Sequence, residues 1–172
     1  KAAADNDLII TSGGVSVGEE DHVKPAVEAE GQLDMWKIAI KPGKPLAFGA
    51  LRAASGPEAL FIGLPGNPVS SFVTFLLCVS PLLRALQGAD AGLPAALPLR
   101  ADFDGPKADK RREFLRVRRN GHGGLDLFPN QSSGVLTSAV WADGLVDNPP
   151  SRAIVHGDVV AYRPWAALMG LA

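Results

Sequence analysis

The sequence predicts an α/β domain followed by a small all-β domain. In the first half, short runs of branched and aromatic residues alternate with helical segments, which favours a sheet with at least some parallel strands. Residues 89–98, rich in Ala, Gly and Pro, are typical of a linker. The rest has little helical period and several short strand-like runs, as in a small β domain. We therefore predict domains at residues 1–88 and 99–172, joined by a linker at 89–98.

The α/β half is predicted to contain two helices. A short helix over residues 22–30 ends at Gly31. A long helix begins with Asn67 as N-cap and Pro68 at its first helical position, and continues to Leu86 with a kink at Pro81. Strands are predicted at residues 8–11, 35–41, 46–51 and 60–62 in this half, and at residues 97–103, 112–118, 125–128 and 158–163 in the β half, with a hairpin turn at 121–124.

Composition excludes several classes of protein. The chain has 17 basic and 18 acidic side chains, and 6% of its residues are aromatic, which argues against a nucleic-acid partner. One cysteine, Cys78, excludes an internal disulfide and favours a reducing compartment. The longest apolar run, residues 72–83, is shorter than the ~20 residues of a membrane span. We expect a cytoplasmic protein with no membrane partner and, because the chain begins without methionine, a fragment.

Two loops follow predicted strands, where α/β proteins place their ligands. Glycines allow close backbone approach to an oxyanion, although an ordinary turn is the favoured interpretation of the first loop taken alone. Pro and Gly fix the shape of the second loop, which directs a helix N-terminus over the sheet. The candidate residues are Gly13, Gly14, Ser16 and Gly18 in the first loop, and Pro65, Gly66, Asn67, Pro68 and Ser70 in the second.

Charged residues gather near these loops. Asp21, with two glutamates before it, could hold a divalent cation, although capping the following helix is the favoured interpretation in isolation. Lys37 and Lys41 share a face of the predicted strand at 35–41, and Lys44 follows. Binding an anion and protecting an edge strand are about equally favoured roles for these lysines.

The β half carries a basic strand. Lys110, Arg111, Arg112, Arg116 and two further arginines lie in or beside residues 112–118, and a solvated face is the ordinary interpretation. Hydroxyl donors such as Ser133 and Ser138 could lie beside this strand. The three histidines lack metal-ligand spacing and Cys78 lies in an apolar run, so all four are interpreted as structural or exposed.

Taken together and in order, these segments resemble the MoeA family, the molybdopterin molybdenumtransferases, which include the E domain of gephyrin. The resemblance rests on DLIITSGGVSVG at residues 7–18, WK at 36–37, KPGKP at 41–45 and GLPGNPVS at 63–70, with RREFLR at 111–116, QSSG at 131–134 and ADGLV at 142–146. It implies part of a MogA-like three-layer domain with a mostly parallel sheet, followed by a small β-barrel-like domain.

The resemblance also implies a reaction and roles. Members insert molybdate into adenylylated molybdopterin with Mg²⁺ and release AMP. The loop from Gly13 to Gly18 would lie against phosphate and adenylate, and Asp21 would support the cation. Lys37, Lys41 and Lys44 would hold anionic substrate. The loop from Pro65 to Ser70 would shape the molybdate region, where Arg111 or Arg112, with Ser133 or Ser138, would contact molybdate.

The resemblance further implies a homodimer, and an adenylyltransferase is a possible partner. Full-length members carry further N-terminal domains and the front half of the α/β domain, so we expect a truncated sheet or self-association, and no transferase activity from this chain alone. The alternatives are a MogA-type adenylyltransferase, disfavoured because its Gly-Gly-Thr-Gly loop is absent, and a gephyrin-like scaffold that binds receptor peptides.

Overall fold

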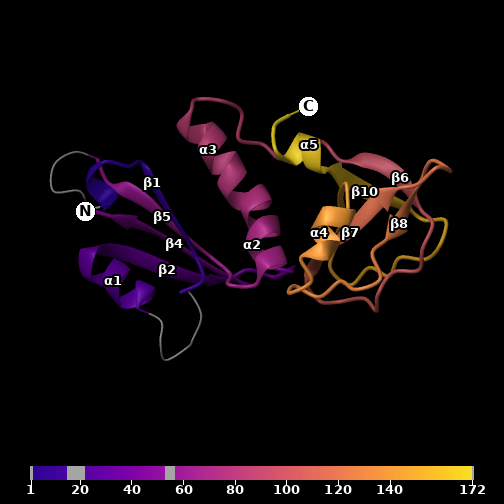
Figure 1. Ribbon diagram of the computed structural model, residues 1–172, viewed down its shortest axis with the longest axis horizontal. Helices are drawn as coiled ribbons and strands as arrows, with labels where there is room; N and C mark the ends of the chain where they lie inside the picture. Colours follow the sequence, from indigo (N-terminus) through magenta and orange to yellow (C-terminus); the bar gives the residue numbers. More distant parts are fainter. Residues whose placement is uncertain (1, 15–21, 53–56, 172) are drawn as a thin grey trace.

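The computed structural model describes residues 2–14, 22–52 and 57–171, with the side chains of Met35 and Trp36 outside that description (Figure 1). The first sheet has the order β1-β5-β4-β2. Its strands are β1 (Leu8–Ser12), β2 (Gly31–Lys37), β4 (Pro45–Leu51) and β5 (Ala59–Leu64). They include three of the four predicted strands of this half, whereas β2 begins at Gly31 and shares only residues 35–37 with the strand predicted at 35–41.

The sheet is mixed, and the expectation of mostly parallel strands is wrong for the described strands. β1 pairs with β5 in parallel, whereas β5 with β4 and β4 with β2 are antiparallel. The reason is connection length: a parallel crossover needs about a dozen residues or more, and the segments joining β2 to β4 and β4 to β5 are shorter.

Helices cover both faces of this sheet, which gives the expected three layers (Figure 1). On one face, Val27 of α1 (Val23–Glu30) packs with Ala47 and Phe61. On the other face, Val79 of the long helix packs with Ile62 and other strand residues. Both packing sets are apolar, so burial of the two sheet faces stabilises this half.

The long helix is continuous but irregular. It comprises α2 (Pro68–Thr74), the π-helical segment η2 (Phe75–Val79) and α3 (Ser80–Leu86). The π segment lies just before Pro81, which has no backbone N–H to continue an α-helical ladder, so the predicted irregularity is present as a π segment. Residues 68–86 have the length and hydropathy of a membrane span, but a core helix passes the same test, and Val69, Val73 and Val79 are fully buried against protein.

The second sheet closes on itself. Its order is β3-β7-β8-β6-β10-β9, and a further β7–β9 pairing joins the last strand to β7. The strands are β3 (Ile40–Lys41), β6 (Leu97–Ala101), β7 (Arg112–Arg119), β8 (Gly124–Leu127), β9 (Gly144–Asn148) and β10 (Val159–Pro164). Leu115, Leu125 and Tyr162 lie in the core that this closure encloses. The predicted β domain is therefore a small barrel.

Three elements of this domain were not predicted. These are β9 and the short helices α4 (Thr137–Trp141) and α5 (Trp165–Leu168). β9 was missed because it ends in Asp147 and Asn148, which are buried here although such residues usually mark turns.

The predicted strand at residues 35–41 is divided between the two sheets. β2 ends at Lys37, and Ala39 then accepts a hydrogen bond from the Arg112 amide at 2.9 Å. β3 pairs in parallel with β7, so the chain leaves the first sheet and joins the second. The second sheet therefore includes residues from the predicted first domain. Its β6 begins at Leu97, inside the predicted linker.

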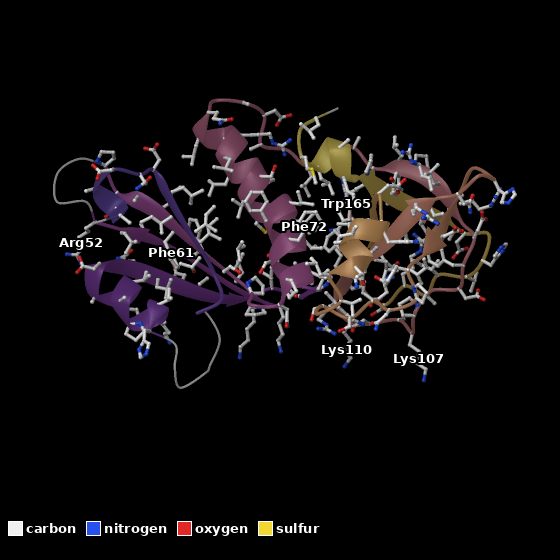
Figure 2. The ribbon with its side chains drawn as sticks, in the orientation of Figure 1. Arg52, Phe61, Phe72, Lys107, Lys110 and Trp165 are labelled. Atoms are coloured by element: carbon white, nitrogen blue, oxygen red, sulfur yellow. The ribbon has the colours of Figure 1, made fainter. Side chains whose placement is uncertain are left out.

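A shared core also joins the two halves. Val69, Val73 and Leu76 of the long helix pack with Phe114, Leu145 and Leu168 of the β domain. Phe72 and Trp165 meet edge to face, with ring centroids 5.1 Å apart (Figure 2). The loops that precede α2 are therefore held against the barrel.

Gly43 provides the first prediction. Its φ is +115°, and a Cβ there would lie 2.4 Å from Thr74 Cγ2. Gly43→Ala should lower the free energy of unfolding by about 2–4 kcal/mol in urea titrations. The backbone strain of an alanine at positive φ and the clash of its Cβ with Thr74 both contribute to this loss. Gly157→Ala is the matched control, since Gly157 has φ +95° and open space around it. Equal losses in the two variants would exclude the contact with Thr74 as a source of the effect.

Candidate active site

Backbone of the two predicted loops meets at the carboxyl ends of β1 and β5. The Gly13 amide donates to the Leu64 carbonyl at 3.0 Å, and a Cβ on Gly13 would lie 3.8 Å from Gly66 Cα. Gly13 has φ +84°, which favours glycine. A cavity of about 300 Å³ lies at this junction, lined by Gly13, Gly14, Pro45, Pro65, Gly66, Asn67 and Ser70.

A second cavity, of about 340 Å³, extends from these loops to the β domain. It shares Pro45, Asn67 and Ser70 with the first, so the two adjoin. Its other lining residues are Lys41, Pro42, Gly43, Lys44, Arg111, Gln131, Ser132 and Ser133. The Val69 amide in the first turn of α2 donates to the Ser133 carbonyl at 3.1 Å. Both domains therefore build one polar hollow.

Asn67 and Ser70 occupy the start of α2. Asn67 is the N-cap, as predicted, but its side chain makes no capping hydrogen bond and the residue lines both cavities. Ser70 is 4% exposed. The adjacent Ser71 hydroxyl donates to the Pro65 carbonyl, which fastens the loop to the helix.

Cationic side chains concentrate in the second cavity. Lys41 Nζ lies 3.0 Å from Glu113 Oε1 and 3.6 Å from Asp109 Oδ2. Arg111 holds both oxygens of Asp109, at 3.0 and 2.7 Å, and these hydrogen bonds lower the pKa of that carboxyl well below its ordinary range. Lys44 is exposed. Three cations thus line a cavity into which neither of the two carboxylates extends.

Arg116 is a functional candidate that the sequence did not single out. It is 1% exposed, and no carboxylate within residues 2–14, 22–52 and 57–171 pairs with its guanidinium. Nη2 donates to the Ser132 carbonyl at 3.3 Å and Nε to Ser138 Oγ at 3.2 Å. Burial lowers the pKa of Arg116 to about 10, so it stays charged at neutral pH. An unneutralised charge therefore lies directly behind the cavity lining.

The predicted site residues divide into three groups. Gly13, Gly14, Lys41, Lys44, Pro65, Gly66, Asn67, Ser70, Arg111 and Ser133 line the two cavities. Lys37, Pro68, Arg112 and Ser138 do not: Lys37 is exposed at the end of β2, Arg112 is bound to both oxygens of Asp147, and Ser138 is buried beside Arg116. Ser16, Gly18 and Asp21 lie outside the described residues.

The basic strand is solvated at Arg112, Arg118 and Arg119, which are exposed as the ordinary interpretation expects, and Arg116 is the exception. Besides buried Arg116, Arg112 pairs with Asp147 and Arg118 lies 4.5 Å above the Trp141 ring. Arg119 pairs with Asp143 at 3.1 Å. Each arginine is committed to a partner, and Arg111 is the one that reaches the cavity lining.

A resident metal is not supported by the described part of the chain. Within it, no group of three or more His, Cys, Asp or Glu side chains is arranged to hold an ion. Asp21, the predicted cation ligand, lies outside that part. The described residues therefore form no Mg²⁺ site by themselves, and we derive no step through this ion.

Comparison with known proteins defines the class of these domains. Residues 1–85 match the model of a probable molybdopterin binding domain, and residues 98–165 match the C-terminal region (domain IV) of MoeA. The order of the two matches is the order of the α/β half and the barrel. The chain belongs to the MoeA family of molybdopterin molybdenumtransferases.

Individual relatives agree with this assignment. A molybdopterin molybdenumtransferase of Haemophilus influenzae is 39% identical over 98% of this chain and 42% of its own length. A gephyrin of Dictyostelium discoideum is 44% identical over 48% of this chain and 13% of its own length. A crystal structure of the MoeA protein of Pyrococcus horikosii superposes with a TM-score of 0.69 and 29% identity, covering 92% of this chain and 38% of that one. The chain thus spans less than half of each relative.

Proposed function

We propose that the chain forms the molybdate-binding part of a molybdopterin molybdenumtransferase, which inserts molybdate into adenylylated molybdopterin and releases AMP. The observation that supports this most directly is the cavity between the domains, lined by Lys41, Lys44 and Arg111 with Arg116 buried behind it. Its half-polar lining and its cations suit a small, doubly charged oxyanion better than an apolar substrate.

Each wall of the cavity has a separate role in this proposal. The ammonium groups and Arg111 neutralise molybdate, and hydroxyls such as Ser70 and Ser133 orient its oxygens. The adjoining cavity at Gly13 and Gly66 receives the phosphate and pterin portion, because glycine backbone allows close approach. Placing both ligands in joined cavities would bring the metal oxide to the dithiolene without a protein nucleophile.

Several finer proposals rest on the family resemblance. We include a requirement for Mg²⁺ held by Asp21, homodimer formation, a cytoplasmic location and possible delivery of substrate by an adenylyltransferase. We also include contacts with phosphate from Ser16 and Gly18, and a contact with substrate from Lys37. Pro68 would support the shape of the loop.

Calorimetric titration of the 172-residue chain with molybdate tests the proposal. We expect saturable binding, and we expect Lys44→Met to weaken it about fivefold or more, because the variant removes one cation from the lining. Lys107→Met is the control, since Lys107 is an exposed lysine outside both cavities (Figure 2).

Two results would contradict the proposal: absence of molybdate binding, or equal weakening by Lys107→Met. The complete reaction is a separate measurement. Molybdate-dependent release of AMP from adenylylated molybdopterin is expected from the full-length protein and not from this chain, which spans 42% of the Haemophilus relative.

A further inference from the structure

We propose that Glu113 is a positioning residue for Lys41, through which the β domain determines where this ammonium group lies in the cavity. The inference rests on the proposed oxyanion-binding function, because it assigns Glu113 a role in that same site. Glu113 itself does not line either cavity.

Strand pairing brings the two residues together from distant parts of the sequence. β3 consists of Ile40 and Lys41 alone, and it pairs in parallel with β7 so that Lys41 lies opposite Glu113. The carboxylate then meets the ammonium at 3.0 Å. Backbone pairing and an ion pair therefore fix the same lysine, at the place where the first half of the chain crosses to the second sheet.

Burial differs sharply between the partners. The Glu113 side chain is 1% exposed, whereas that of Lys41 is 38% exposed and the residue lines the cavity. The carboxylate thus lies in the protein interior, and the lysine with which it pairs lines the cavity. This arrangement restrains a long, flexible side chain from behind and leaves donors available on its other side.

The remaining contacts of Glu113 argue against a purely structural role. Its second oxygen, Oε2, is buried without a hydrogen-bond partner among the described residues, and so is Oδ1 of Asn148, the residue opposite Glu113 on β9. A glutamine at position 113 could place a donor near the Asn148 oxygen while keeping the shape of the side chain. Glutamine at position 113 should therefore stabilise the fold at least as well as glutamate does. The negative charge of Glu113 is explained instead by its ion pair with Lys41.

Asp109 does not duplicate this role. It lies 3.6 Å from Lys41 Nζ, but both of its oxygens already accept from Arg111. Glu113 has no such second cation among the ion pairs of the described residues. We therefore expect Glu113 to restrain Lys41 more strongly than Asp109 does.

The test uses the 172-residue chain and molybdate as the probe. Glu113→Gln should weaken molybdate binding about fivefold, because the freed lysine must be ordered when the anion binds. Glu113→Asp, which keeps the charge, should restore part of the affinity. In a Lys41→Met background, Glu113→Gln should cause no further loss. The urea midpoint of Glu113→Gln should stay at or above that of the parent.

A second readout does not depend on molybdate. Reductive methylation followed by mass spectrometry measures the accessibility of each lysine, and Glu113→Gln should speed modification of Lys41 severalfold while Lys44 is unchanged. Unchanged Lys41 modification would overturn the inference, as would unchanged or tighter molybdate binding by a folded Glu113→Gln variant. If the parent chain binds no molybdate but Lys41 modification responds, the proposed function fails and the restraint on Lys41 stands.

Discussion

Arg116→Met is expected to weaken molybdate binding at least ~30-fold, or ~2 kcal/mol, which is typical of a charge-assisted interaction in a desolvated site. Arg116 is the one arginine of β7 that is fully buried, and none of the described carboxylates neutralises it. A bound oxyanion would act as its counter-ion. Because the variant also removes the desolvation cost of a lone buried charge, the thermal midpoint without molybdate should change little. Calorimetric titration measures the molybdate affinity, and thermal unfolding measures the midpoint.

The control for this variant is Arg119→Met on the same strand. Arg119 is 62% exposed and pairs with Asp143, so its loss should change molybdate affinity less than about twofold. Molybdate should raise the thermal midpoint of the parent and of Arg119→Met but not of Arg116→Met, since a ligand stabilises only the state that binds it. Equal stabilisation of all three proteins by molybdate would rule out Arg116 as part of the anion site.

Leu145→Ala is expected to lower both stability and molybdate affinity. Leu145 is fully buried in the core that joins the long helix to the barrel, and large-to-small substitutions in cores cost about 2–5 kcal/mol. A cavity there would loosen the contact between the domains. Because the cavity proposed to bind molybdate has one wall from each domain, we expect a severalfold loss of molybdate affinity. Urea unfolding measures the loss of stability, and titration with molybdate at low denaturant measures the loss of affinity.

Leu125→Ala is the matched control. Leu125 is equally buried, but its core lies within the barrel. Its loss should destabilise the protein by a similar amount and leave molybdate affinity within about twofold. Equal losses of affinity in the two variants would show that general destabilisation, and not the contact between domains, controls the site.

Local sequence signals were sufficient to predict the start of the long helix and the two loops. Asn67 and Pro68 mark the start of the long helix because a cap and a proline without an N–H suit that position. Gly13 and Gly66 mark the loops because glycine is common in turns, and the positive φ of Gly13 favours glycine there. The mixed sheet could also have been predicted from the sequence, because the connections between its later strands are too short for parallel crossovers.

Other features depend on tertiary contacts that leave no local signal. Period-two alternation continues from residue 36 to residue 41, yet the strand divides because Arg112 takes the Ala39 carbonyl as a partner. Arg116 lies in a strand with several other arginines, and nothing in its sequence neighbourhood distinguishes the buried one. Its burial follows from the barrel and from Gln131, whose amide bonds both the N–H and the carbonyl of Arg116.

The crossing of β3 into the second sheet has a topological consequence. Residues 40 and 41 belong to the barrel by hydrogen bonding but to the first half by sequence, so cutting the connection between α3 and β6 would not release two independent modules. The two peptides would co-elute as a nicked heterodimer. A barrel expressed from β6 onward would lack β3 and the residues that the first half contributes to the cavity between the domains.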